Sequence, residues 1–182
     1  MAEREIYPVQ IGGLTRQLPL FEVAPGVRIA IFNMLGDTYV IKAAAAALGE
    51  ALQNSQADVL LTAEAKSIPL AYELSALLGL PFVVLRKTYK SYMGQAISAA
   101  TVSITTGSQQ MLYLDEKDID QVRGNYCILL DDVISTGSTL KGMRQIVAAA
   151  GGHVSQVAAV FTEGDGDWDD VVCLGNLPVF TS

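Results

Sequence analysis

Several features that often indicate a functional class are scarce in this 182-residue sequence. It has no run of about 18 apolar residues, and it opens with the polar and acidic residues Met-Ala-Glu-Arg-Glu, so neither a membrane span nor a secretion signal is predicted. The two cysteines, Cys127 and Cys173, do not have the spacing of a zinc site, and two isolated thiols are typical of a reducing compartment. We therefore expect a cytoplasmic protein without a membrane-spanning segment.

Positive charge is also scarce. The 12 Lys and Arg residues are outnumbered by 19 Asp and Glu residues, which gives a formal net charge of -7, and no stripe of basic residues is visible. A nucleic-acid groove needs clustered Lys and Arg, so nucleic acid is not expected as a partner. The glycine motifs of dinucleotide-binding and P-loop proteins are missing as well. A small anion is still compatible, because backbone amides and a few local cations can bind it.

The hydrophobic residues, 51% of the chain, form short apolar stretches that alternate with helical patterns. Strands are predicted at 27–32, 57–63, 81–85, 128–132 and 153–161, and helices at 39–53, 68–78 and 138–150. This alternation favours an α/β fold with a parallel sheet. The length suits one domain, residues 1–182, with a core at about 27–162. A small hood is expected from 1–26 and 163–182, and within it residues 4–26 are expected to be irregular or to form short strands.

The most informative stretch is residues 128–140, with the sequence ILLDDVISTGSTL. The apolar residues predict a buried strand that ends at Asp131 and Asp132, and the small residues after them lead into a helix. Free amides, hydroxyls and the dipole at a helix N-terminus favour an anion there. A ribose phosphate would suit both halves, because its phosphate fits the turn and its hydroxyls fit the carboxylates. An ordinary Ser or Thr cap explains one hydroxyl, but not four hydroxyls together with two aspartates.

Two further predicted strands end in cations. Lys66 follows the strand at 57–63, and the sequence Arg-Lys-Thr-Tyr-Lys at 86–90 follows the strand at 81–85. Ligands of open α/β sheets bind at the carboxyl ends of the strands. These side chains could instead be solvated surface cations, which is the usual environment of lysine. Three cations within five residues, in a chain with so few, favour an anion site.

Residues 91–110 form a long polar segment between two predicted strands. The stretches 101–105 and 110–114 predict a hairpin around Gly107-Ser108. A connection of this length is uncommon unless it has a function. We therefore expect a flexible loop here.

Together these residues resemble the type I phosphoribosyltransferases. Residues 128–140 resemble the phosphoribosyl pyrophosphate (PRPP) signature of that family, and Glu64–Leu70 looks like the corresponding loop of its adenine and xanthine enzymes. The resemblance covers about residues 27–162. It implies a doubly wound parallel sheet with a small hood and a loop that closes over the sugar. It also implies a homodimer that uses Mg²⁺ and transfers the phosphoribosyl group of PRPP to a purine base, most simply adenine, in purine salvage.

The resemblance also implies roles for individual residues. Asp131 and Asp132 would hold the ribose hydroxyls as the catalytic pair, and would bind Mg²⁺ mostly through the diphosphate and water. The 5′-phosphate would lie on Ser135, Thr136, Gly137, Ser138 and Thr139. The diphosphate would contact Ala65, Lys66, Ser67, Arg86, Lys87 and Lys90, and a cis or strained peptide is expected at Ala65-Lys66. The base would lie near Phe32, Asn33, Met34 and Trp168, although a loop tryptophan can equally pack locally.

Two departures from the family pattern leave the base open. The adenine enzymes carry a glutamate followed by Tyr-Gly in the flexible loop, whereas this sequence has Ile-Thr-Thr-Gly-Ser at 104–108, with Thr105 and Thr106 as the remaining candidates. The xanthine enzymes have a lysine where Gly164 stands. Two alternatives to an adenine enzyme therefore remain. One is a hypoxanthine- or xanthine-specific enzyme, and the other is a regulatory domain that senses PRPP without catalysis, as in the purine-operon repressor.

Overall fold

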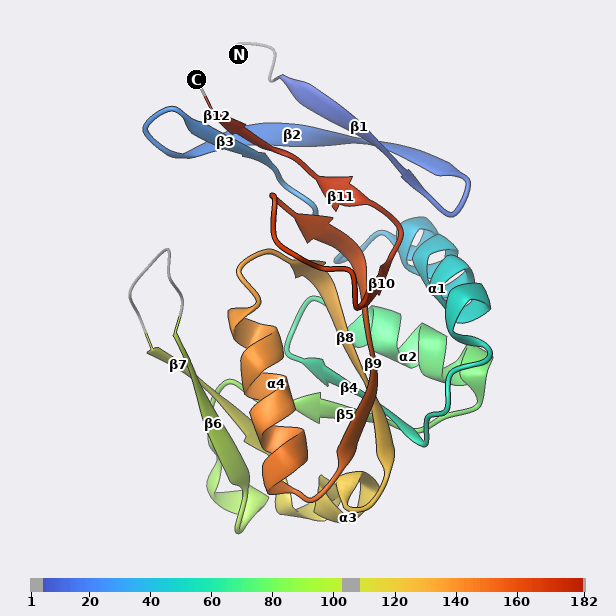
Figure 1. Ribbon diagram of the computed structural model, residues 1–182, viewed down its shortest axis with the longest axis vertical. Helices are drawn as coiled ribbons and strands as arrows, with labels where there is room; N and C mark the ends of the chain where they lie inside the picture. The colour runs from blue at the N-terminus through green and yellow to red at the C-terminus, as the bar shows by residue number, and fades with distance from the viewer. Residues whose placement is uncertain (1–4, 103–108, 182) are drawn as a thin grey trace.

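The computed structural model describes residues 5–102 and 109–181. Its largest sheet is parallel, with the strand order β10-β9-β8-β4-β5 and with β11 also paired to β9. The strands are β4 (Val59–Ala63), β5 (Phe82–Leu85), β8 (Tyr126–Ile134), β9 (His153–Glu163), β10 (Val171–Cys173) and β11 (Asn176–Leu177). Helices α1 (Thr38–Leu52) and α2 (Ile68–Leu78) lie on one side of this sheet and α4 (Ser138–Ala149) lies on the other (Figure 1). The predicted α/β fold with a doubly wound parallel sheet is confirmed.

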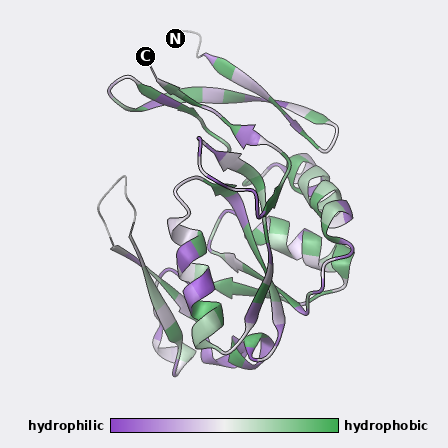
Figure 2. Ribbon diagram, viewed as in Figure 1, coloured by the Kyte–Doolittle hydropathy of each residue, from purple (hydrophilic) through white to green (hydrophobic). Residues whose placement is uncertain are grey.

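Both faces of the central strands are buried, because successive side chains of a strand point to opposite faces. In β8, Ile128 and Leu130 pack in the same cluster as residues of α1 and α2, whereas Cys127 and Leu129 pack in the cluster that contains residues of α4. The central strands and α2 are accordingly coloured mainly as hydrophobic residues in Figure 2. The carboxyl ends of β4, β5 and β8, which carry the predicted site residues, are thereby held in fixed positions.

A second sheet lies above the parallel one (Figure 1). It is antiparallel, with the order β1-β2-β3-β12, and consists of β1 (Ile6–Ile11), β2 (Leu14–Ala24), β3 (Val27–Ala30) and β12 (Val179–Thr181). Residues 4–26 were expected to be irregular or to form short strands, but β2 alone has 11 residues, and Ile11 is fully buried. We call this sheet the hood.

The boundary between hood and core differs from the prediction at both ends. Residues 27–30 were expected in the core, but β3 pairs with β2 and β12 and so belongs to the hood. Residues 171–177 were expected in the hood, but β10 and β11 pair with β9 in the parallel sheet. The pattern of a short apolar strand predicts its existence but not its partners, since pairing is decided by the rest of the fold.

Regular elements make up much of the described part of the segment that was expected to be a flexible loop. It begins with a 3-10 turn (Ser91–Met93), and β6 (Ile97–Val102) then pairs with β7 (Gln109–Leu114). The hairpin packs on α4 so closely that a Cβ added to Gly142 would lie 2.2 Å from Cγ2 of Thr101. The predicted hairpin is confirmed with an earlier start. Its turn, with Thr105 and Thr106, lies outside the described residues. A second 3-10 turn (Glu116–Asp118) and α3 (Ile119–Val122) lead into β8.

Among the described residues, neither the two thiols nor the histidine belongs to a group of three or more His, Cys, Asp or Glu side chains that could hold a metal ion. Cys127 is buried at the start of β8, where burial raises the pKa of its thiol to about 11, and Cys173 is half-buried. His153 is exposed, and its ring lies 5.5 Å from that of Tyr126. In the part of the chain that the structure describes, no helix is both long and apolar enough to cross a membrane.

Candidate active site

The loop between β8 and α4 forms a cavity of about 200 Å³. Gly137 caps the helix with a φ of +71°, a left-handed conformation that glycine adopts at little cost. The first amides of α4 have no partner within the helix and are therefore available to an anion. The lining includes all five residues predicted for the 5′-phosphate, Ser135, Thr136, Gly137, Ser138 and Thr139. The structure thus brings the predicted phosphate residues together.

The two aspartates at the end of β8 are in different environments. Asp131 accepts hydrogen bonds at Oδ1 from the Ser67 hydroxyl at 2.8 Å and from the Asp132 N–H at 2.9 Å. Burial raises the pKa of Asp131 to about 7, and the Asp132 carboxylate adds to that shift. Asp132 is buried, and its Oδ2 lies 3.8 Å from Nζ of Lys66 but has no hydrogen-bond partner among the described residues. Both carboxylates can therefore accept further hydrogen bonds or bind a cation.

The loop after β4 lines a second cavity of about 190 Å³ beside these aspartates. Ala65, Lys66 and Ser67 all line it, as predicted for residues that contact a diphosphate. Ser67 is buried and uses its hydroxyl to hold Asp131, so it also orients that carboxylate. The unusual peptide was expected at Ala65-Lys66, but the cis bond is one position earlier, at Glu64-Ala65.

The cations after β5 do not all reach this cavity. Lys87 lines it, but Nε of Arg86 lies 2.6 Å from Oε2 of Glu64, and Arg86 lines a separate cavity with Asp115 and Lys117. Burial alone would raise the pKa of Glu64, but the Lys87 N–H and the Arg86 guanidinium outweigh burial and keep that pKa below its usual range. The Arg86 guanidinium is thus paired with Glu64 and does not line the second cavity, and its contact with a diphosphate stays a prediction.

Lys90, the third predicted cation, is exposed and is not among the residues that line the second cavity. It precedes the 3-10 turn at Ser91–Met93, and its backbone N–H contacts the sulfur of Met93 at 3.3 Å. The structure therefore places Lys87, but not Lys90, beside the Lys66 loop.

A third cavity, of about 230 Å³, lies between the hood and the carboxyl ends of β8 and β9. We call it the hood cavity. Its lining is Ile29, Ala30, Ile31, Phe32, Lys66, Asp132, Val133, Ser135 and Glu163. It shares Lys66 and Asp132 with the second cavity and Ser135 with the first. The three cavities therefore adjoin around the end of β8.

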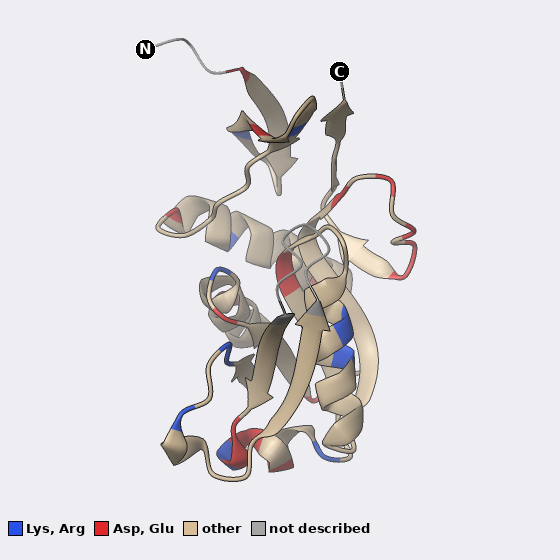
Figure 3. Ribbon diagram, turned by 90° about the vertical axis from the view of Figure 1, so that its left-hand side faces the viewer, with Lys and Arg blue, Asp and Glu red and all other residues tan. Residues whose placement is uncertain are grey.

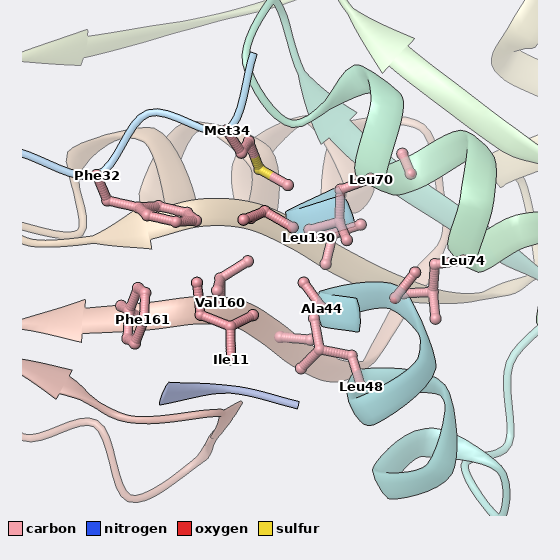
Figure 4. Packing of buried hydrophobic residues seen from close by; sticks show 14 of the residues in the cluster. Ile11, Phe32, Met34, Ala44, Leu48, Leu70, Leu74, Leu130, Val160 and Phe161 are labelled. Carbon is pink, nitrogen blue, oxygen red and sulfur yellow. The ribbon is translucent and has the colours of Figure 1, made fainter. Parts of the chain in front are cut away.

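Of the residues predicted to contact a base, only Phe32 lines the hood cavity. Its ring meets that of Phe161 edge-to-face at 5.0 Å. Met34 is fully buried in the core near Leu130 and Leu70, as Figure 4 shows, and Asn33 is exposed, with Oδ1 accepting the Leu35 N–H at 3.2 Å. The structure therefore does not bring Met34 and Asn33 to the cavity. Their positions follow from an irregular chain direction between β3 and α1, which the sequence pattern does not reveal.

Trp168 was predicted to stack on a base, but its indole packs on the phosphate loop. A Cβ added to Gly137 would lie 2.8 Å from Cη2 of Trp168, and one added to Gly166 would lie 2.4 Å from its Nε1. The buried Nε1 has no hydrogen-bond partner among the described residues. Trp168 therefore supports the loop that caps α4, and the alternative of local packing is the one the structure shows.

The described residues offer few direct ligands for Mg²⁺ at this site. The described residues contain no group of three or more His, Cys, Asp or Glu side chains that could hold a metal ion by themselves. Magnesium is usually bound through one or two carboxylates together with substrate phosphates and water. Asp131 and Asp132 fit that role, since Oδ2 of Asp132 is buried without a hydrogen-bond partner among the described residues. A cation held mainly by a phosphorylated ligand is therefore compatible with the site.

Sequence reasoning did not find Glu163, Ile29, Ile31 or Val133 as site residues. Glu163 ends β9, next to β8, so its carboxyl-end position was a usable signal. Ile29 and Ile31 offered no signal, because an apolar residue at the end of a strand is most simply explained as core.

Comparison with known proteins identifies the family. A sequence model described as the phosphoribosyl transferase domain matches residues 34–172. The hypoxanthine/guanine phosphoribosyltransferase of Methanocella paludicola is 31% identical over 117 residues, which are 63% of this chain and 58% of that protein. The purine biosynthesis transcriptional repressor PurR of Bacillus subtilis is 26% identical over 144 residues, which are 79% of this chain and 50% of that protein. This chain thus spans between half and three fifths of the length of these two relatives.

A solved structure agrees in fold. The adenine phosphoribosyltransferase from Thermoanaerobacter pseudethanolicus has a TM-score of 0.68 at 21% identity, and the match covers 94% of this chain and 95% of that one. At this level of identity the likeness describes the fold alone. The family match, by contrast, includes the strand end, the phosphate loop and α4. The chain therefore belongs to the type I phosphoribosyltransferase family.

Proposed function

We propose that this chain is a purine phosphoribosyltransferase, which transfers the phosphoribosyl group of PRPP to a purine base and gives a nucleoside monophosphate and diphosphate. The observation that carries the proposal is the set of three adjoining cavities around the end of β8. One has the chemistry for a phosphate, one has lysines beside two carboxylates, and one has apolar walls. PRPP together with a purine base presents the matching three parts.

In the proposed reaction, a ring nitrogen of the base forms a bond to the anomeric carbon as the bond from that carbon to the diphosphate oxygen breaks. The electron pair leaves with the diphosphate, and the N–H proton of the base passes to water or to the departing diphosphate. Asp131 and Asp132 accept hydrogen bonds from the ribose hydroxyls and stabilise positive charge that develops on the sugar. Lys66 and Lys87 attract the leaving group. Catalysis then comes mainly from orientation and electrostatic stabilisation.

When bound, Mg²⁺ would offset negative charge on the diphosphate, and Asp131 and Asp132 would hold it mostly through the diphosphate and water. Within the protein, Ser67 orients the Asp131 carboxylate by hydrogen bonding. Apolar residues of the hood cavity exclude water from the base side of the sugar.

Adenine is our first proposal for the base, because Glu64–Leu70 and the Arg86-Lys87 pair resemble the adenine enzymes. Hypoxanthine and guanine are the competing proposal, supported by relatives such as the Methanocella paludicola protein. A diphosphate-release assay with PRPP, Mg²⁺ and adenine, hypoxanthine, guanine, xanthine, uracil or orotate tests this. Release with any purine supports the enzyme.

The aspartates provide the decisive variant. In a protein with both Asp131→Asn and Asp132→Asn, we expect at least about a thousandfold loss of turnover, since both oriented acceptors become neutral amides. Cooperative unfolding of the variant shows that the fold is kept. Near-normal turnover would reject the proposed site.

A regulatory domain that binds PRPP without catalysis is the second candidate. The match to the Bacillus subtilis repressor favours it, as does the lack of a carboxylate in the sequence at 104–108, where the adenine enzymes carry a glutamate. Saturable binding of PRPP without diphosphate release from any base would support this candidate over the enzyme.

A cytoplasmic homodimer completes the proposal. Light scattering of the purified protein measures the mass in solution, and fractionation of cells measures the location. A mass of 19.4 kDa at working concentration would reject the dimer.

A further inference from the structure

We infer that Glu163 reads the base, and that its carboxylate selects an aminopurine, guanine or adenine, over xanthine and orotate. This inference rests on the proposed function in one respect, namely that a base occupies the hood cavity. It assigns the preference between bases in that cavity to one side chain. The apolar walls alone would not provide such a preference.

The position of Glu163 is fixed by hydrogen bonds on both sides. It is the last residue of β9, and the Nδ2 of Asn176 donates to Oγ1 of Thr162 and to the Gly164 carbonyl, each at 3.0 Å. The Thr162 N–H donates to the Gly175 carbonyl at 3.1 Å, and the Gly164 N–H donates to the Leu177 carbonyl at 2.9 Å. A recognition group on a well-anchored strand end can discriminate between ligands, because little order must be created on binding.

Glu163 is also the charged group of the hood cavity that the rest of the site leaves available. Lys66 and Asp132 lie 3.8 Å apart and face the sugar and diphosphate side, whereas Glu163 forms no ion pair with any described residue. The other walls include Ile29, Ile31 and Val133. Apolar walls with a few placed polar groups are the usual composition of a small-molecule site, and the polar groups provide specificity.

The chemistry of a carboxylate decides which bases fit. An ionised glutamate only accepts hydrogen bonds, so it recognises N–H groups. Guanine offers two adjacent donors, N1–H and the 2-amino group, and adenine offers its 6-amino group. Xanthine has no amino group and loses a proton more readily than the other common purines, and orotate carries a carboxylate. Like charges in a partly buried cavity repel each other more strongly than in water.

The loop after Glu163 is acidic as well, but it is not part of the cavity wall. Asp165, Asp167, Asp169 and Asp170 follow on the loop between β9 and β10, and Figure 3 shows acidic residues along that loop. Asp170 is paired with Arg144 at 2.9 Å, and its carbonyl accepts from Nε2 of Gln156, so the far end of the loop lies away from the end of β9. The repulsion of an anionic base is therefore assigned to Glu163 itself.

The test measures binding of GMP, AMP, IMP and XMP by calorimetry, in the absence of turnover. All four carry the same 5′-phosphate and ribose, so differences in Kd isolate the base. We expect the wild-type protein to bind GMP at least about tenfold more tightly than XMP, with AMP between them, because a hydrogen bond to a charged group has about that value. The Glu163→Gln variant should reduce the ratio of the XMP and GMP dissociation constants to about threefold or less. Glu50→Gln, an exposed position on α1, is the matched control and should leave it unchanged.

The outcomes separate this inference from the proposed function. Equal binding of XMP and GMP by the wild-type protein, or an unchanged ratio in Glu163→Gln, overturns the inference even if diphosphate is released with a purine. A preference for GMP that depends on Glu163, without diphosphate release, overturns the enzyme and supports an aminopurine-nucleotide preference of a sensor. If Glu163→Gln does not unfold cooperatively, Glu163→Asp replaces it, and weaker GMP binding with XMP still disfavoured is the expected result. Unchanged GMP binding by that variant overturns the inference.

Discussion

The sugar-phosphate side and the base side of the site are built in different ways. The phosphate cavity is lined by Asp131 and residues 133–140, which follow one another in a single strand, turn and helix. The hood cavity draws on residues 29–32, on Lys66 and on Asp132, Val133, Ser135 and Glu163, which come from both sheets and from the loops after β4 and β8. Contiguous residues keep their mutual geometry when the rest of the chain changes, whereas a wall assembled from distant segments can change with any of them. The sugar-phosphate side should therefore be less sensitive to changes elsewhere in the chain than the base side.

The largest expected effect is electrostatic and confined to the sugar side. Burial raises the pKa of Asp131 to about 7 in the folded protein, against about 3.9 in an unfolded chain. Between these values the folded state retains a proton that the unfolded state has lost, so stability falls as the pH rises from about 4 to 7 and stays low above that. We expect Asp131→Asn to be more stable than wild type by about 4 kcal/mol at pH 8, with little difference at pH 4, measured by denaturant unfolding. A stability difference that does not vary with pH would show that Asp131 on the sugar side does not have a raised pKa.

The next largest effect is expected from Gly137→Ala in the phosphate loop. Comparison with Gly79→Ala separates loss of the loop geometry from the strain of a left-handed backbone. Gly137 and Gly79 both have left-handed φ values, +71° and +68°, but an added Cβ meets Trp168 at 2.8 Å only at Gly137 and meets nothing within 4 Å at Gly79. Each Gly→Ala change should cost about 1 kcal/mol of stability for the left-handed backbone, and Gly137→Ala should cost more because its Cβ collides with Trp168. We expect Gly137→Ala also to weaken binding of ribose 5-phosphate by about 2 kcal/mol, roughly thirtyfold, while Gly79→Ala leaves it unchanged. Equal binding by the two variants would show that the geometry of the loop is not what binds the phosphate.

A smaller effect distinguishes the cations on the sugar side. Lys87 lines the second cavity, Arg86 is paired with Glu64, and Lys90 does not line the cavity. We expect Lys87→Ala to raise the KM for PRPP about tenfold, because a charge-assisted contact with the diphosphate is lost. Arg86→Ala and Lys90→Ala should each change it by less than about threefold. A larger effect of Arg86→Ala would mean that the guanidinium leaves Glu64 when PRPP binds.

The smallest effect is spectroscopic. Trp168 is the single tryptophan of the chain and contacts Gly137 on the sugar-phosphate side. Its fluorescence should therefore change when ribose 5-phosphate is added, and should not change when adenine or guanine is added alone. A change in fluorescence on addition of the base alone would indicate that the indole lies on the base side of the site.

The fold and the sugar-phosphate side could be predicted because their signals are local. A run of aliphatic residues that ends in two aspartates and four hydroxyls predicts a buried strand, its end at the sheet edge and the start of a helix. The strand β8 and the helix α4 confirm this prediction. Lys66 could be placed for the same reason, since it directly follows a buried strand. Each of these predictions depended only on neighbouring residues.

The base side could not be predicted in the same way. Whether β3 pairs with the core or with the hood depends on β2 and β12, and the four residues of β3 contain no signal for either partner. Trp168 was expected beside the base or in local packing, because it follows the last core strand, and the path of the loop after β9 brings the indole to Gly137. Arg86 was expected in the diphosphate site because of its charge, and the ion pair with Glu64 becomes visible only when the ends of β4 and β5 are placed side by side. The positions of β3, Trp168 and Arg86 all depend on contacts with segments that are distant in the sequence.

The short strand β12 makes one wall of the hood cavity depend on a short edge pairing. Its three residues pair with β3 at Val179↔Ile29, Phe180↔Arg28 and Thr181↔Val27, and Ile29 is part of the cavity wall. A three-residue strand at the edge of a sheet frays more readily than the buried strands of the core. Transient release of these C-terminal residues would loosen the wall around the base while β8 and its phosphate loop stay folded. On the proposed function, fraying of β12 would open the base side of the site while the sugar side stays folded.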